Sequence, residues 1–423
     1  MENTFTNDSR KSIATDYLIR QALSDYLSSD LPDFKEMKKT SYIKKIINEK
    51  QIHYLLDKLI TEIQIHREKN PIDPRFTETE SIKEIIVSYL LEFDKKKYFF
   101  DKPFLKFFID KGYINVADEF ISRATRDDGH LKPIEIFQAM RNVWIMNSLQ
   151  IMWGITLGLT SSIYGYSMLY PYTDNFLDNP QIDMIDKKKF NLRLSRALNG
   201  ENQLSNNAHE SRVFALVKEI ESQYNRDKYT KVYESILLIQ KAQINSLKQD
   251  QETKMTVDDI LPISFLKGGS SVLADAFLVK GNLSSDEIRF SFEYGVFLQL
   301  LDDLQDAIED KVEGHQTIFS IHNKDESFDE NINRLISYIF KVNTPIIGES
   351  RTTTLMKEII ISCTLIMIMD AVGRNQSLVS EKLYKKLESY SKVRLSFYKK
   401  LELRINELLK PFVLSKSINK IHD

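Results

Sequence analysis

The chain of 423 residues is poor in the residues that interrupt helices and in those that form cross-links. It contains 13 glycines, 10 prolines and a single cysteine, Cys363. It has neither a glycine-rich phosphate loop nor an alternation of strands with helices, and such a composition favours long helices. One cysteine also excludes an internal disulfide and a cysteine-rich zinc site. These absences predict an all-α protein.

The charge pattern gives no sign of nucleic acid or of export. The formal net charge is −2, and the polar N-terminus lacks the apolar stretch of a secretory signal, so we expect a cytoplasmic protein without a nucleic-acid partner. Residues 142–173 contain no charge and are long enough to span a membrane. Polar residues within this segment favour a single buried central helix instead.

The most informative motif is LQLLDDLQDAIEDK, which ends at Lys311. Asp302, Asp306 and Asp310 are spaced by four, so they share one face of a helix predicted from about Ser285 to Lys311. Like charges at this spacing destabilise a helix by about 0.2–0.5 kcal/mol per pair. A stripe of three therefore indicates a hard divalent cation, which prefers carboxylate oxygens, with a solvated acidic face as the alternative.

A second acidic pair, Asp174 and Asp178, follows the uncharged segment and precedes Asn179. Two apolar helices that each end in acids can face one another across the mouth of a cavity. Such a mouth would bind several Mg²⁺ ions, which keep coordination positions open for the phosphates of a substrate. Taken by itself, Asp174 is equally well explained as a helix cap or turn residue.

These motifs resemble those of class I isoprenoid enzymes. DNFLDN (174–179) and DDLQDAIED (302–310), together with KGGSSVLADAFLV (267–279), are most similar to the bacterial large terpene synthases, the group that includes tetraprenyl-β-curcumene synthase. The resemblance extends from about residue 104 to the C-terminus and is best between 134 and 319. It implies a class I terpenoid synthase-like helical bundle around a central cavity, with extra N-terminal helices. We expect an N-terminal helical segment at 1–95 and a synthase-like helical domain at 96–423.

The expected site residues fall into three sets. The catalytic carboxylates would be Asp174, Asp178, Asp302 and Asp306, and Asp310 would join them as a metal ligand. The predicted substrate-binding residues are Asn179, Lys267, Gly268, Gly269, Gln299, Asp303 and Lys311. The glycine pair would let the backbone approach an anion, while Arg193, Arg196 and Arg226 are further basic candidates, each also explicable as a surface charge.

The expected reaction is Mg²⁺-dependent ionisation of a long linear prenyl diphosphate, with release of diphosphate and formation of a terpene. Aromatic faces would stabilise the carbocation, by about 0.5–2 kcal/mol each. The candidates, which could also be ordinary core residues, are Trp144, Trp153, Tyr164, Tyr166, Tyr170, Tyr172, Phe292, Tyr294 and Phe297.

Two alternatives stay open. Asp303 makes the motif similar to the DDxxD of chain-elongating polyprenyl diphosphate synthases, although no motif for a second diphosphate is present. A non-catalytic helical scaffold is the alternative of another class. A product this apolar would allow a peripheral contact with a membrane, and the sequence leaves a homodimer open.

Overall fold

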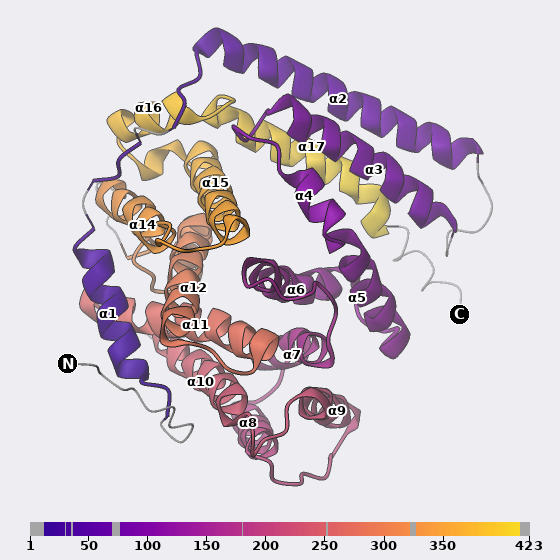
Figure 1. The fold of residues 1–423 in the computed structure, drawn as a ribbon, viewed down its shortest axis with the longest axis vertical. Coiled ribbons are helices and arrows are strands. Elements are labelled where there is room, and N and C mark those ends of the chain that lie inside the picture. Colours follow the sequence, from indigo (N-terminus) through magenta and orange to yellow (C-terminus); the bar gives the residue numbers. More distant parts are fainter. Residues whose placement is uncertain are drawn as a thin grey trace. The chain divides into compact units, whose positions relative to one another are not determined.

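The computed structural model describes residues 12–29, 31–34, 37–69, 77–179, 181–250, 253–321 and 327–414. Within its helices, the side chains at 67, 69, 77–81, 178 and 407–414 lie outside the description. Helices make up 76% of the chain and the described ranges contain no strand (Figure 1), which confirms the predicted all-α class.

The chain divides into two compact units. The first, here called the acidic unit, comprises the start of the chain to Asp30, Gly112–His322 and Ser337–Glu358. Its helices are α1 (Thr15–Leu27), α5 (Tyr113–Asp127), α6 (Pro133–Met152), α7 (Ser161–Asp178), α8 (Met184–Leu198), α9 (Ala208–Gln223), α10 (Thr230–Ser246), η1 (Leu247–Asp250), α11 (Val257–Lys280), α12 (Ser285–Gln305) and α13 (Ala307–Glu313).

The second unit comprises Leu31–Lys111, Asn323–Ile336 and Ile359–Asp423. Its helices are α2 (Tyr42–Lys69), α3 (Thr77–Lys96), α4 (Leu105–Asp110), η2 (Gln376–Leu378), α16 (Glu381–Tyr390) and α17 (Leu395–Leu414), and it shares α14 (Asp329–Val342) and α15 (Arg351–Arg374) with the acidic unit. Buried Glu49 on α2 accepts a bidentate pair from Arg394, which ties distant parts of the sequence together. The predicted boundary at residue 95 stays a prediction.

The core of the acidic unit is the antiparallel pair α11 and α12, which lie side by side in Figure 1. A Cβ added to Gly295 would lie 2.0 Å from the carbonyl oxygen of Gly268, so the two backbones touch where the glycines meet. α10 packs on another side of α11, and α6, α7 and α1 also contact it. The motif KGGSSV therefore lies inside a helix and neither begins nor breaks one.

The uncharged segment 142–173 is not the single helix that we expected. α6 ends at Met152 and α7 begins at Ser161, and the residues between them are not helical. Gly154 has a φ of +67°, which glycine adopts readily. The side chain of Gln150 bonds both the N–H and the carbonyl of Gly158, and Thr160 caps α7. The break is thus stabilised by side chains as well as by glycine.

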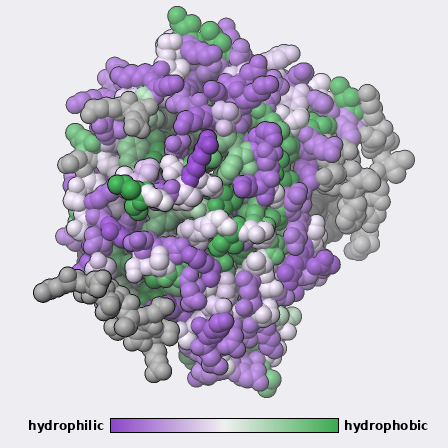
Figure 2. Space-filling model, viewed as in Figure 1, coloured by the Kyte–Doolittle hydropathy of each residue, from purple (hydrophilic) through white to green (hydrophobic). Residues whose placement is uncertain are grey.

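Helix α11 is the one described helix that is long and apolar enough to cross a membrane, by length and composition alone. Of its most apolar stretch, 78% is buried within the protein, as in the core helix of a bundle. The face drawn in Figure 2 is mostly hydrophilic, with hydrophobic side chains visible between the polar ones.

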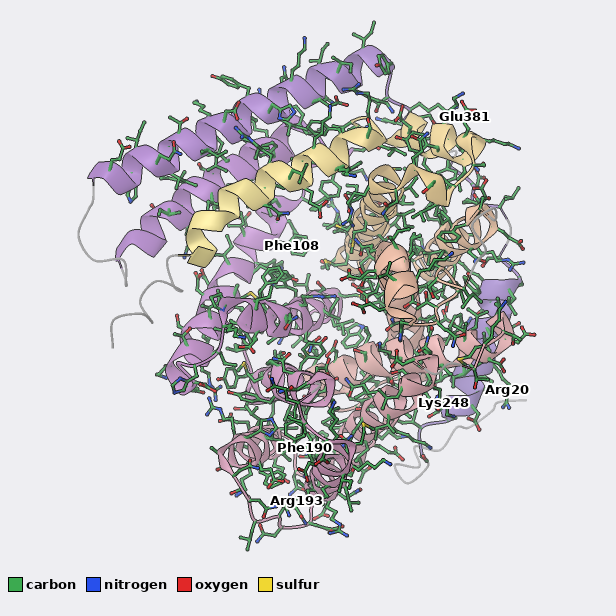
Figure 3. The ribbon with its side chains drawn as sticks, turned by 180° about the vertical axis from the view of Figure 1, so that it is seen from behind. Arg20, Phe108, Phe190, Arg193, Lys248 and Glu381 are labelled. Carbon is green, nitrogen blue, oxygen red and sulfur yellow. The ribbon has the colours of Figure 1, made fainter. Side chains whose placement is uncertain are left out.

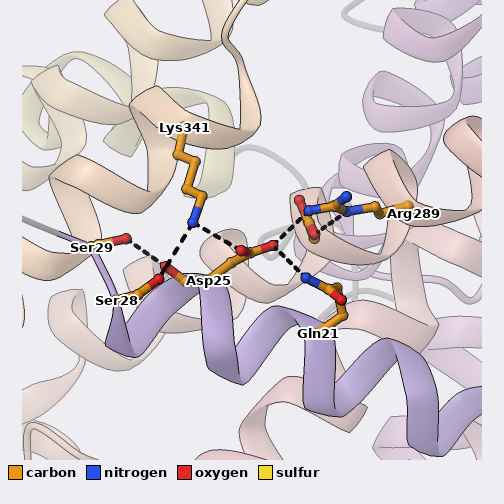
Figure 4. Close-up of polar contacts among 7 residues, drawn as sticks. Gln21, Asp25, Ser28, Ser29, Arg289 and Lys341 are labelled. Atoms are coloured by element: carbon orange, nitrogen blue, oxygen red, sulfur yellow. Dashed lines mark hydrogen bonds and ion pairs between the residues drawn. The ribbon is translucent and has the colours of Figure 1, made fainter.

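Helix α1 belongs to the acidic unit through a buried polar network (Figure 4). Asp25 accepts hydrogen bonds from Arg289 at 2.6 Å and from Lys341 at 2.8 Å. Burial alone would raise the pKa of Asp25, but hydrogen bonds from Lys341 and Gln21 and the two positive charges hold it below its ordinary value. The N-terminal helix is therefore anchored to α12 and to the end of α14.

Candidate active site

The three regularly spaced aspartates keep their common face, although the acidic helix differs from the prediction. It is divided into α12, which ends at Gln305, and α13, which starts at Ala307, with a bend at Asp306. The N–H of Asp306 still bonds the carbonyl of Asp302 at 3.0 Å, and the N–H of Asp310 bonds that of Asp306 at 2.8 Å. Because this four-residue bonding continues through the bend, the carboxylates stay in one row.

The three aspartates of this row differ in solvent exposure. Asp302 and Asp306 are exposed, whereas Asp310 is half-buried. Burial raises the pKa of Asp310 to about 6, His315 and Lys267 oppose the rise, and the charges of Asp306 and Asp302 add to it. Mutual repulsion of this kind is relieved by a bound cation.

Tyr170 on α7 connects the two acidic motifs. Burial raises the pKa of its phenol, and so do the charge of Asp174, a hydrogen bond to Asp174 and the charge of Asp302. The amide of Gln243 on α10 donates a second hydrogen bond to Asp174, at 3.1 Å. Asp174 and Asp302 therefore act on one side chain from different helices. The backbone of Asp178 ends α7, but its side chain lies outside the described residues.

Asp303, predicted to bind substrate, faces inward. It is buried, and it accepts hydrogen bonds from Gln299 at 2.8 Å and from Ser264 on α11 at 3.3 Å. Burial raises its pKa to about 7, despite the hydrogen bond from Gln299 and the charge of Lys267. Asp303 and Gln299 thus bond each other and tie α12 to α11.

The remaining predicted binding residues divide between the rim and the core. Lys267 lies near enough for its charge to act on Asp303 and Asp310. Lys311 is exposed, and Asn179 accepts a bond from the N–H of Gln181. The glycine pair allows close packing: Gly268 faces Gly295 and Gln299, and Gly269 faces the ring of Phe292. This packing explains the glycines without an anion.

Two of the predicted aromatic residues have partners elsewhere. Tyr164 donates to Asp127 and lies under the guanidinium of Arg123, whereas Tyr172 donates to Asp128. Tyr166 is different, because it packs against Ala274, Ile239 and Ala242 inside the acidic unit. Tyr166 and Tyr170, one turn apart on α7, are thus the aromatics that lead from Asp174 into the interior of the acidic unit.

The donor chemistry of this mouth fits Mg²⁺, since every expected ligand is a carboxylate. Within the described residues, no three His, Cys, Asp or Glu side chains are gathered closely enough to hold a metal. Arg141 on α6, which the sequence did not single out, lies 3.6 Å from Asp302. Its charge also lowers the pKa of Tyr170. Arg141 and Gln243 are the polar partners that the predicted site lacked.

A separate cavity of about 730 Å³ lies beside α8 and the start of α9, where Figure 3 labels Phe190 and Arg193. Arg193 is already engaged by Glu210, at 2.7 Å, and Lys189 by Asp186, at 3.0 Å. Arg226 bonds Glu221 and the carbonyl of Ala197. Arg196 lies 3.8 Å from Glu201, so all three arginines considered from the sequence make ion pairs.

Searches of protein-family models, of curated proteins and of solved structures found no match to this chain. The resemblance to terpene synthases therefore rests on the motifs at 174–179, 267–279 and 302–310.

Proposed function

We propose that this protein is a class I terpene synthase that ionises a long linear prenyl diphosphate with the help of Mg²⁺. The observation that carries the proposal is the position of Tyr170. Its phenol is influenced by Asp174 of one acidic motif and by Asp302 of the other, although 128 residues separate them. Two carboxylate motifs that act on one phenol from the ends of apolar helices would fit a diphosphate site bridged by metal ions.

Each side chain then has a chemical task. Asp174, Asp302, Asp306 and Asp310 supply hard oxygen ligands, with Asp178 as the fifth predicted carboxylate. Bound Mg²⁺ would neutralise the diphosphate oxygens and so make them a better leaving group. Lys267 and Arg141 would add positive charge at the rim, and Tyr166 and Tyr170 would offer aromatic faces to the carbocation.

The inward orientation of Asp303 favours this reaction over chain elongation. The adjacent aspartates 302 and 303 were the main sequence feature in common with elongating synthases. Asp303 is buried and bonded to Gln299 and Ser264, so its carboxyl is engaged inside the bundle and not at the mouth. Elongation remains the runner-up, and a non-catalytic scaffold is the remaining alternative.

The test is incubation of the purified chain with Mg²⁺ and allylic diphosphates of increasing length, with and without isopentenyl diphosphate. We expect diphosphate release and a hexane-extractable, non-phosphorylated product without isopentenyl diphosphate. Products that require isopentenyl diphosphate and remain diphosphates would identify an elongating enzyme. No diphosphate release from any chain length would favour the scaffold.

A further inference from the structure

Asp275 on α11 is a buried carboxyl group that the proposed ionisation does not use. Its side chain is 1% exposed, and its Oδ1 atom has no hydrogen-bond partner among the described residues. The neighbouring Ala274 packs with Ile239, Ala242 and Tyr166. A buried polar atom without a partner costs free energy, so a native protein that keeps one gives reason to seek its ligand.

The register of α7 against α11 places Asp275 below the acidic mouth. Ser162 Oγ bonds the carbonyl of Leu278 at 2.8 Å, and one turn further Tyr166 packs against Ala274. The charge of Asp275 acts on the phenol of Tyr166. Asp174 lies eight residues beyond Tyr166, which is about 12 Å along the helix axis. Asp275 is thus two turns deeper than the first metal motif.

Two more buried oxygens, on the helices that contact α11, have no partner within the described ranges: Ser167 Oγ on α7, next to Tyr166, and Asn147 Oδ1 on α6. The three helices α6, α7 and α11 pack against one another. Buried waters in proteins typically make about three hydrogen bonds to such groups. Burial also raises the pKa of Asp275 well above its ordinary value, which favours the neutral carboxyl that water can bond without a buried charge.

We propose that Asp275 holds a water molecule among α6, α7 and α11, two turns below the proposed metal site, and that this water captures the carbocation to give a terpene alcohol. The inference rests on the proposed ionisation. A lone pair of the water oxygen forms the new C–O bond, and the proton released goes to the diphosphate leaving group. Prenyl diphosphate and water thus become alcohol and hydrogen diphosphate, and Asp275 ends as it began. It is a positioning residue, because it acts through the water.

The experiment measures diphosphate release during turnover in water labelled with oxygen-18. The hexane-extracted product is then analysed by mass spectrometry for its structure and for the label. The wild-type product should be an alcohol that carries the label. Asp275→Leu removes the acceptor, so the ratio of alcohol to hydrocarbon should fall by about tenfold or more while diphosphate release stays within about threefold. Asp275→Asn keeps an acceptor oxygen and should restore the alcohol. Ser270→Ala, whose hydroxyl bonds only its own helix, is the matched control and should match the wild type.

The outcomes separate the two proposals. Wild-type protein that releases diphosphate but yields an unlabelled hydrocarbon overturns the role of Asp275 and leaves the ionisation intact. An unchanged alcohol ratio in a folded Asp275→Leu variant does the same. Absence of diphosphate release in the wild type overturns the ionisation, and the water site with it. If the leucine variant does not fold, an unlabelled wild-type product would still overturn the proposal.

Discussion

Asp302 and Asp303 are adjacent on α12, yet their surroundings are opposite. Asp302 is exposed beside Arg141, on the same row as Asp306 and Asp310. Asp303 points about 100° away into the contact with α11, where burial raises its pKa to about 7. Identical residues thus differ in their availability to a metal ion because the helix presents them to different neighbours. The motif DDLQD contains one outer and one inner carboxylate.

The largest expected effect is on the outer carboxylate. Asp302→Asn should lower diphosphate release by more than about a hundredfold, because it removes a proposed metal ligand. Asp303→Asn should lower it by less than about tenfold, since the amide oxygen can still accept from Gln299 while the amide NH2 donates to the hydroxyl of Ser264. Steady-state release of diphosphate by purified variants measures both. A fully active Asp302 variant would remove this residue from the site, and an unchanged melting temperature would show that its fold is intact.

The inner carboxylate should control how stability depends on pH. Its pKa is raised from 3.8 to about 7, so between these values the folded protein keeps a proton that the unfolded chain has lost. Stability should therefore fall as pH rises from about 4 to about 7 and level off above, by up to about 4 kcal/mol. Asp303→Asn should remove that part of the slope in urea titrations with EDTA. Parallel curves for the variant and the wild type would mean that Asp303 is not buried as described.

Asp303 is buried, unlike Asp302, because α11 lies close to α12. A methyl group added between the two helices should disturb this contact. In Gly295→Ala the new Cβ would lie 2.0 Å from the carbonyl oxygen of Gly268, so the helices must separate, at a cost of about 2–3 kcal/mol. Gly158→Ala is the control, because a Cβ there meets nothing within 4 Å. Chemical denaturation compares the two. Equal stability of both variants would contradict the contact between the helix backbones.

The smallest effect concerns the charge beside Asp302. Arg141 and Asp302 are both largely exposed, and such pairs are worth little. Arg141→Gln should therefore raise the affinity of the substrate-free protein for Mn²⁺ by only about twofold to fivefold, because the ligand loses a competing cation. Electron paramagnetic resonance of free Mn²⁺ measures it. Weaker binding in this variant would assign Arg141 a supporting role for the metal site instead of a competing one.

Periodicity was enough to predict the helical class and the common face of Asp302, Asp306 and Asp310, because both follow from local spacing. The prediction of a single helix over the uncharged segment was wrong between Met152 and Ser161, where the chain is not helical. Gly154, Gly158 and Thr160 were signals of a break there, but the bonds from Gln150 to Gly158 depend on the folded loop. Hydropathy cannot distinguish a loop closed by side chains from a helix.

The site was harder to predict than the fold because it depends on contacts between helices. Asp303 and the glycine pair were assigned to the substrate, whereas their observed neighbours lie across the contact between α11 and α12. Arg141 gave no signal, since its place beside Asp302 depends on how α6 packs. Asp275 did carry one: it is the charged residue in the apolar run SSVLADAFLV. A carboxyl inside such a run indicates a buried polar group. Asp275 was not predicted as a site residue because it belongs to neither acidic motif.

The anchoring of α1 has a consequence for how the chain can be shortened. Asp25 is the shared counter-charge of Arg289 and Lys341, which lie more than 250 residues away in the sequence. A truncated chain that begins after Asp30 would leave both cations without this carboxylate and would uncover the surfaces of α11 and α12 on which α1 packs. A fragment that begins just before the first acidic motif, at 174–179, therefore lacks a helix that the acidic unit needs. Helix α1 can therefore complete its contacts only after the helices that carry Arg289 and Lys341 have been made.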